Sequence, residues 1–247
     1  MKIVVISDIH GNYDALLNFP EDYDQLWVLG DLVNYGPQPG EVISLVQNRA
    51  TYVARGNHDH FVGFGEPPRC APQFQEMAEA TWKYTDGVLT DGDKEYLRSL
   101  PLQIDVWVGK IHCRLCHGIP TNPPFRQHPS ADRDWDDECR RVSADILFYG
   151  GGHVAAGRKS RSTLLVNPGS LGQSRCGEPV ASYAVLKDGK VSLRSFHYPV
   201  GLTAEKVRAL PISASIRSEL INLLRTGVVR QDSAPAVTAG RMLHQAR

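Results

Sequence analysis

The N-terminal part of the chain alternates short apolar runs with helical stretches, and this pattern constrains the fold more than any other feature. Residues 2–7, 26–29 and 51–54 are apolar runs of strand length. Residues 12–19 and 40–48 lie between them and space their apolar side chains as helices do. Strands joined by helices run parallel within one sheet. The chain is therefore predicted to be an α/β protein whose first strands are parallel.

Polar side chains follow each of these three runs at the point where the strand should end. Asp8 and His10 follow the first run, Asp31 follows the second, and Asn57 and His58 follow the third. Ligands of open α/β sheets bind outside the carboxyl ends of the strands. We therefore expect these five side chains to converge at one edge of the sheet.

The rest of the chain predicts further helices and a second set of strands. Residues 72–85, 91–99 and 134–143 have helical composition, and residues 203–226 predict one or two helices interrupted near Pro211. Strand-like runs cover residues 102–108, 111–116, 146–149, 164–166, 181–186 and 191–196. No repeat or linker divides this pattern, so we expect one domain over residues 1–227. Residues 228–247 are polar and without periodicity, and we expect a flexible tail there.

Charge and hydropathy argue against several classes of partner. The chain has 27 basic and 27 acidic residues and no basic run, so we expect neither a nucleic-acid backbone nor an anionic membrane as partner. No apolar run approaches the roughly 18 residues that span a bilayer, and the apolar run at residues 3–6 is too short for a signal peptide. We therefore expect a cytoplasmic protein. Nothing in the sequence indicates an oligomeric state.

Short clusters of oxygen and imidazole donors follow strand-like runs along the whole chain. They are Asp8-Ile9-His10, Gly30-Asp31, Gly56-Asn57-His58-Asp59, His117-Gly118 and Gly150-Gly151-Gly152-His153. Carboxylate, amide and imidazole groups together suit Mn, Fe, Zn or similar divalent ions. Two such ions about 3.5–4 Å apart can clamp the attacking and leaving oxygens of a phosphoryl transfer. Asp31 is the natural bridging ligand because its cluster has only one strong donor.

The order of these clusters resembles the calcineurin-like metallophosphoesterase family, whose pattern is D-x-H, G-D-x-x-x-x-G, G-N-H-[DE], H and G-H-T-H. The chain shows the same order over residues 1 to about 197. Its segment Asn167-Pro168-Gly169-Ser170 is similar to one in the small bacterial and archaeal phosphodiesterase-like branch. The resemblance implies a four-layer α/β/β/α sandwich. It also implies hydrolysis of a phosphodiester, phosphomonoester or nucleotide by in-line attack of a metal-bound hydroxide.

The resemblance also implies a role for each motif residue. Asp8, His10 and Asp31 would bind a first ion, completed by a histidine of the last motif. Asp31 would bridge to a second ion, whose other ligands would be Asn57, His117 and another histidine of the last motif. His58 would bind no metal. It would donate a proton to the leaving oxygen or hold a phosphate oxygen.

The last motif departs from the family pattern. Aligned without a gap, Gly151 occupies the place of the second-metal histidine and His153 keeps the first-metal role. Shifted by two residues, His153 would bind the second ion and Ala155 would replace the other histidine. The ungapped placement keeps the usual distance to Asn167 and is preferred. Either placement leaves one imidazole short, so the alternative function is a weakly active or non-catalytic metal-binding or regulatory module.

Three further residues are candidates for binding substrate or supporting His58. Arg175 follows the N-P-G-S segment and would either reach a substrate phosphate or lie in solvent as a surface arginine. In the protein-phosphatase branch of the family, an Asp after the G-D motif supports the catalytic histidine. Asn34 occupies that region here and is a weaker partner, and Asp59 could serve instead.

Two simpler interpretations compete with the metal-site prediction. Asp8 could merely cap the helix that starts near Asn12. Cys113-x-x-Cys116-His117 matches the c-type haem attachment pattern. That attachment belongs with export, and an apolar strand is an ordinary place for free cysteines, so we expect no haem.

Overall fold

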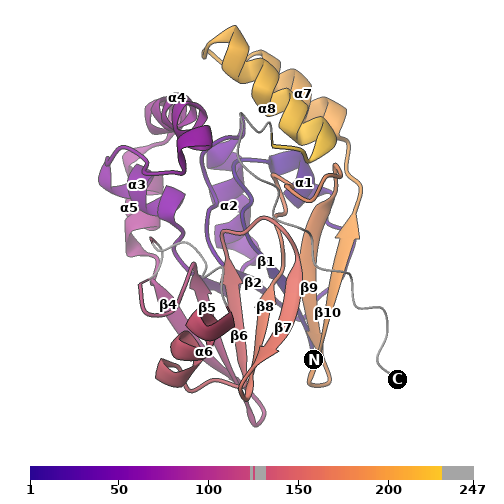
Figure 1. The fold of residues 1–247 in the computed structure, drawn as a ribbon. Coiled ribbons are helices and arrows are strands. Elements are labelled where there is room, and N and C mark those ends of the chain that lie inside the picture. Colours follow the sequence, from indigo (N-terminus) through magenta and orange to yellow (C-terminus); the bar gives the residue numbers. More distant parts are fainter. Residues whose placement is uncertain (123–124, 126–131, 230–247) are drawn as a thin grey trace.

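The computed structural model describes residues 1–122, 125 and 132–229, and its two β-sheets lie face to face between helices (Figure 1). One sheet has the strand order β10-β9-β1-β2-β3 and the other has the order β4-β5-β6-β8-β7. The predicted α/β/β/α sandwich is confirmed. The tail expected to be flexible lies outside the described residues from residue 230 onward.

The first sheet contains the strands that the N-terminal alternation predicts. β1 (Lys2–Ile6), β2 (Gln25–Val28) and β3 (Tyr52–Val53) are parallel, and α1 (Tyr13–Leu17) and α2 (Pro39–Arg49) connect them. The hairpin of β9 (Ala181–Lys187) and β10 (Lys190–Phe196) continues the sheet on the other side of β1, where β9 runs antiparallel to it. The sheet is therefore mixed, with the parallel part at the predicted strands.

The second sheet has parallel strands at its centre and antiparallel strands at its edges. β5 (Ile111–His117), β6 (Ile146–Gly150) and β8 (Thr163–Asn167) are parallel, with β4 (Gln103–Val108) and β7 (Ala156–Ser160) outside them. β7 was not predicted, because its polar and glycine residues lack the apolar run of a central strand. Cys113 and Cys116 of the haem-like pattern are buried free thiols of β5.

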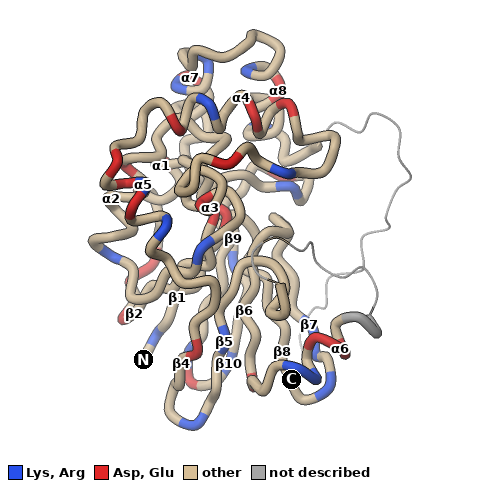
Figure 2. Tube along the Cα trace, turned by 90° about the vertical axis from the view of Figure 1, so that its left-hand side faces the viewer, with Lys and Arg blue, Asp and Glu red and all other residues tan. Residues whose placement is uncertain are grey.

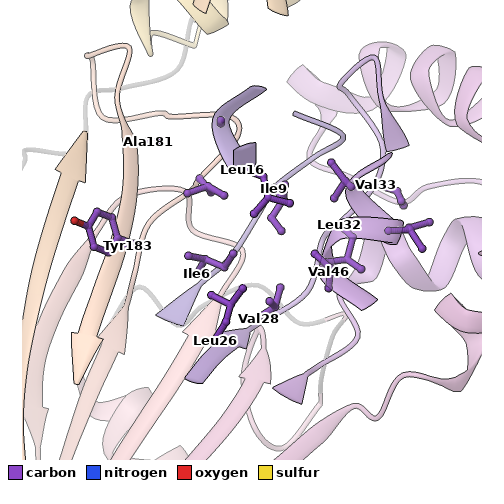
Figure 3. Close-up of a cluster of buried hydrophobic side chains, with 14 of the residues drawn as sticks. Ile6, Ile9, Leu16, Leu26, Val28, Leu32, Val33, Val46, Ala181 and Tyr183 are labelled. Atoms are coloured by element: carbon purple, nitrogen blue, oxygen red, sulfur yellow. The ribbon is translucent and has the colours of Figure 1, made fainter. Parts of the chain in front are cut away.

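Alternate side chains of the first sheet pack in opposite directions, which explains the layered arrangement. Ile6 and Val28 pack toward α1 and α2, in the cluster shown in Figure 3. Ile3, Val5 and Trp27 pack against the second sheet. The outer face of the second sheet is covered by α6 (Asp132–Arg141).

Helices close the sandwich at the end where β1 and β2 finish. α4 (Pro72–Val88) packs with α7 (Val200–Arg208) and α8 (Ala214–Thr226), and these three helices lie near the top of Figure 1. The break between α7 and α8 falls around Pro211, as predicted. α5 (Asp91–Ser99) has the bounds that the sequence predicts. α3 (Asn57–Phe64) was missed because it begins inside a cluster interpreted as metal ligands.

Charged side chains form networks on the surface without gathering into one basic face. Figure 2 shows Lys and Arg interspersed with Asp and Glu along the described chain. Glu21 is the centre of one network, since its carboxylate accepts from Tyr183 at 2.6 Å and pairs with Lys2 and Arg194. This network ties the segment before β2 to β1, β9 and β10. None of the described helices has both the length and the hydropathy needed to cross a membrane.

Candidate metal centre

The loops after β1 and β2 run side by side and carry the first predicted ligands. The amide of Asp8 donates to the carbonyl of Gly30 at 3.0 Å, and the amide of His10 donates to the carbonyl of Asp31 at 2.9 Å. Asp8, His10 and Asp31 have φ angles of 54°, 49° and 54°. Non-glycine residues rarely adopt this left-handed conformation, and those that do cluster at functional sites. The two loops are therefore bonded to each other in a strained geometry that aims three donors at one place.

Glycines of the motifs allow the backbone to approach these donors. A Cβ atom at Gly56 would collide with the carboxylate of Asp31, and a Cβ atom at Gly150 would collide with Ser7 and lie 2.8 Å from Nδ1 of His117. No side chain fits at either position without displacing a donor. The glycines next to the predicted ligands therefore have a steric role.

Three buried histidines are anchored in the same way. In each, Nδ1 donates to a main-chain carbonyl, which can only accept: His10 to Val33 at 3.1 Å, His117 to Leu29 at 2.9 Å and His153 to Gln173 at 2.7 Å. In the neutral imidazole Nδ1 therefore carries the hydrogen, and the lone pair is on Nε2. A backbone or carboxylate partner on the far nitrogen is the usual arrangement of a metal-binding histidine.

The Nε2 atoms converge with two carboxylates. Oδ1 of Asp8 lies 3.2 Å from Nε2 of His153 and 3.8 Å from Nε2 of His10. Oδ2 of Asp31 lies 3.2 Å from Nε2 of His117 and 3.8 Å from Nε2 of His10. The donors form two groups, one of Asp8, His10 and His153 and one of Asp8, Asp31 and His117. Asp31 thus lies between one imidazole of each group.

These donors are buried, and some of their atoms have no hydrogen-bond partner within the described protein. Oδ1 of Asp8 and Nε2 of His117 make no hydrogen bond. Burial raises the pKa of Asp8 and lowers the pKa of His10 to about 3. Burial alone would lower the pKa of His117, but the carboxylate of Asp31 outweighs it and the pKa rises to about 10. A divalent cation held by these carboxylate oxygens and imidazole nitrogens would supply positive charge and would displace the proton that Asp31 favours on His117.

His58 is bonded differently from the other three histidines. Its Nδ1 lies 2.8 Å from Nδ2 of Asn34, and this nitrogen also lies 3.3 Å from the carbonyl of Ala78. Because that carbonyl can only accept, the amide nitrogen of Asn34 faces both groups and donates to His58. Nε2 of His58 therefore carries the hydrogen in the neutral ring. Burial lowers the pKa of His58 to about 4. His58 faces the pocket as a hydrogen-bond donor, not as a lone-pair donor.

The carboxylate of Asp59 bonds to backbone amides and not to the ring of His58. It accepts from the backbone amides of Asp31 and Leu32 at 2.8 Å each and of Gly56 at 2.9 Å. It therefore fixes the loop after β2 to the start of α3. Asn57 is the first residue of α3 and lines the pocket beside His58. Of the two residues suggested as partners of His58, the structure places only Asn34 against it.

The glycine-rich segment after β6 lies against the first donor group. The amide of Gly151 donates to Oδ2 of Asp8 at 3.0 Å, and the φ of Gly151 is +83°. His153 lies beside Asp8 and His10, whereas Ala155 packs against Gly169. Asn12, not Asp8, caps α1, so the capping interpretation of Asp8 is wrong. The neighbours of His153 are those that the ungapped placement requires.

A pocket with a volume of about 370 Å³ opens over these donors. It contains Arg175, which the sequence could not distinguish from a solvated surface arginine. The guanidinium carbon of Arg175 lies 4.0 Å from the ring centre of Phe74. Sequence reasoning missed the other walls of the pocket, including Tyr35, Arg69 and Phe74. No motif marks these residues, because they lie in a loop and at the start of a helix.

The geometry of the candidate metal centre agrees with the family and the proteins that the chain resembles. The model of the calcineurin-like phosphoesterase superfamily domain matches residues 1–189. The chain belongs to this superfamily. A metallophosphoesterase from Sphaerobacter thermophilus has a similar structure, with a TM-score of 0.76 and 27% identity over 92% of this chain and 99% of that one. An uncharacterized protein of Methanocaldococcus jannaschii is 28% identical over 83% of this chain and 91% of its own length.

Shorter segments of the chain match symmetrical bis(5'-nucleosyl)-tetraphosphatases. A symmetrical bis(5'-nucleosyl)-tetraphosphatase of Nitrosococcus oceani is 43% identical over 67 residues. These residues are 24% of this chain and 24% of the tetraphosphatase. The chain therefore spans about a quarter of that relative's length.

Proposed function

We propose that this member of the superfamily is a metal-dependent phosphoesterase that hydrolyses a small phosphodiester, phosphomonoester or nucleotide. The observation that supports this most is the common anchoring of His10, His117 and His153. Each turns Nε2 toward Asp8 or Asp31 in one buried cluster. Three imidazoles held in the metal-binding tautomer around two carboxylates have no comparable role in packing the core.

The proposed ligand sets start from the two donor groups, with Asp31 added to the first and Asn57 taking the place of Asp8 in the second. Asp8, His10, Asp31 and His153 would hold the first ion, and Asp31, Asn57 and His117 would hold the second. Divalent ions such as Mn, Fe or Zn would neutralise the phosphoryl oxygens and activate water for attack in line with the leaving group. The protein's own side chains would bind and orient the phosphoryl group.

His58 and its partner would act on the phosphoryl group. With Nδ1 accepting from Asn34, Nε2–H of His58 points into the pocket and would donate to a phosphate oxygen. A neutral imidazole that gave up this hydrogen would become an anion, so the arrangement favours holding the phosphate over protonating the leaving oxygen. Asp59 would keep Asp31 in place through its backbone. Arg175 would contribute positive charge to substrate binding.

A panel of phosphoesters tests this function. The protein is incubated with added Mn and with phosphomonoesters, phosphodiesters and nucleotides, and its metal content is measured in parallel. Metal-dependent turnover that chelation abolishes and Mn restores is the expected result. The matched control is His117→Ala, which removes one imidazole of the second donor group. Equal rates for this variant and the wild type would refute the proposal.

Gly151 favours one alternative function. Its position holds a histidine in the family pattern, and glycine supplies no ligand. A weakly active or non-catalytic metal-binding or regulatory module would bind ions at the first donor group but show little or no turnover on bis(p-nitrophenyl) phosphate. Metal stoichiometry and turnover, measured on the same sample, separate this module from the enzyme.

A further inference from the structure

The half of the pocket that faces α4 is cationic. Its lining residues are Arg69, Cys70, Ala71, Gln73, Phe74 and Arg175. Asp31 is the one acidic residue among the described residues that line the pocket, and it belongs to the metal half. The two halves therefore offer different chemistry to a ligand, with metal donors at one end and guanidinium groups at the other.

Arg175 is a half-buried cation that forms no salt bridge within the described protein. Its Nη2 donates to the side-chain oxygen of Gln173 at 2.8 Å, and its guanidinium lies over Phe74. Its Nε is buried and makes no hydrogen bond, and the carboxylates of Asp8 and Asp31 act on it only through their charge. Partial burial without a hydrogen-bonded anion is unfavourable for a cation. Gln173 and Phe74 fix the direction of Arg175 but leave its charge for an anionic ligand.

The start of α4 reinforces this end of the pocket. Its N-cap residue, Ala71, has no side chain to cap the first turn, and Ala71, Gln73 and Phe74 line the pocket. Pro72 has no amide hydrogen and the amide of Phe74 donates to the carbonyl of Ala71 at 2.8 Å, so this end of the helix attracts anions mainly through its dipole. Arg69 lies further out with 78% of its side chain exposed, and it pairs with Glu66 at 3.0 Å. Exposed pairs of this kind are weak, so Arg69 can turn to an anion at the pocket mouth.

We propose that the α4 half of the pocket is a second phosphate subsite, and that the substrate is therefore a phosphoanhydride such as a nucleoside polyphosphate. One phosphoryl group lies at the metal donors and the next lies against Arg175. The pocket volume of about 370 Å³ is within the range of small-molecule sites. This inference rests on the proposed phosphoesterase function of the metal half.

The reaction that follows is hydrolysis of the anhydride bond. A water oxygen bonds to the phosphorus at the metal donors. The bond from that phosphorus to the bridging oxygen breaks, and the electron pair stays on the bridging oxygen. The water protons pass to the product phosphates or to solvent. Arg175 offsets the charge that develops on the leaving phosphate.

Relative rates on two substrates test the subsite. The quantity measured is the kcat/KM for a dinucleoside tetraphosphate divided by the kcat/KM for bis(p-nitrophenyl) phosphate, which has one phosphate. Arg175→Gln should lower this ratio by about 10- to 100-fold, as expected for loss of a charged hydrogen bond. Arg69→Gln, which changes an exposed side chain and does not threaten folding, should lower it by about 3- to 10-fold.

Arg49→Gln is the matched control, since Arg49 is exposed in the last turn of α2 and does not line this pocket. It should leave the ratio unchanged. If Arg175→Gln lowers both rates equally, the subsite is wrong, because Arg175 then serves the scissile phosphate, and the phosphoesterase function stands.

Binding to metal-depleted protein separates the subsite from the catalytic proposal. By calorimetry, inorganic pyrophosphate should bind the wild type at least about 10-fold more tightly than orthophosphate. Arg175→Gln should lose this preference. Equal binding of the two anions by the wild type would overturn the subsite. If the Mn-loaded protein hydrolyses nothing, the phosphoesterase function fails, and the calorimetric preference alone decides the subsite.

Discussion

Asp31→Asn should abolish metal binding at both proposed ion sites, because Asp31 is a ligand of each in our assignment. Oδ1 of Asp31 accepts from the backbone amide of His58 at 2.9 Å, so the oxygen of an asparagine must stay on that side. The amide nitrogen then takes the place of Oδ2, which is 3.2 Å from Nε2 of His117. There it donates to the lone pair that would bind the metal. The substitution therefore removes a ligand and blocks a second one.

The size of the effect can be estimated from binding linkage. An ion present at 100 times its dissociation constant stabilises a protein by about 2.7 kcal/mol. In a chain of this size, each kcal/mol raises Tm by roughly 2–4 °C. Each bound Mn ion should therefore raise the Tm of the wild type by about 5–10 °C, and Asp31→Asn should remove the whole increase.

Asp8→Asn separates a bridging ligand from a terminal one. Oδ2 of Asp8 accepts from the amide of Gly151, so the oxygen of an asparagine would stay on that side. Its amide nitrogen would then take the place of Oδ1, which lies 3.2 Å from Nε2 of His153 in the first donor group. This variant should keep about half of the Mn-dependent increase in Tm. Asp14→Asn is the control for losing a buried carboxylate, because Asp14 bonds to Thr203 and Lys206 outside the site. It should lower Tm but keep the full increase. If Asp31→Asn keeps the full increase while Asp8→Asn loses it, Asp8 is the bridge and our assignment is refuted.

Three other substitutions have defined outcomes. His58→Ala should retain bound Mn but lower kcat by about 10²–10³-fold, as for loss of a donor to the phosphate; a loss that shrinks with better leaving groups would instead indicate proton transfer. Gly151→His should tighten the second ion in calorimetric titrations despite its strained φ of +83°, and a gain only in Ala155→His would refute the ungapped placement. Burial alone would raise the pKa of Glu21, but its hydrogen bonds lower it from 4.5 to about 2. Because solvent screens these surface pairs, Glu21→Gln should cost only about 1–2 kcal/mol at pH 7, and this difference should disappear as the pH falls from 4.5 to 2; a difference that stays constant in urea titrations across this range would contradict it.

The site residues that could be predicted are those that lie at the ends of strands recognisable from their own local sequence. Asp8, His10 and Asp31 directly follow strands whose apolar runs are easily recognised, and the order of parallel strands brings them together. His117 is the last residue of β5. The βαβαβ pattern therefore predicted both the sheet and the edge at which these side chains meet.

The unpredictable parts depend on contacts between distant segments. β7 has no apolar run, because an edge strand with an exposed face does not need one. The beginning of α3 is polar, since its first residues line the site instead of the core. Asn34 bonds to His58 with its nitrogen because of the carbonyl of Ala78, which lies 44 positions further along the chain. Local sequence patterns contain no information of this kind.

The position of Arg175 follows from the same reasoning and bears on substrate choice. The amide of Gly172 donates to the carbonyl of Asp8, and a Cβ atom at Gly172 would collide with the carbonyl of Ile9. The segment that leads to Arg175 is thus bonded to the loop that carries the first ligands. Phe74 approaches Arg175 from α4, a separate element. The metal donors and the α4 half of the pocket are therefore held by separate elements, so a substitution in the loop before α4 can change the anion that fits there without moving a metal donor.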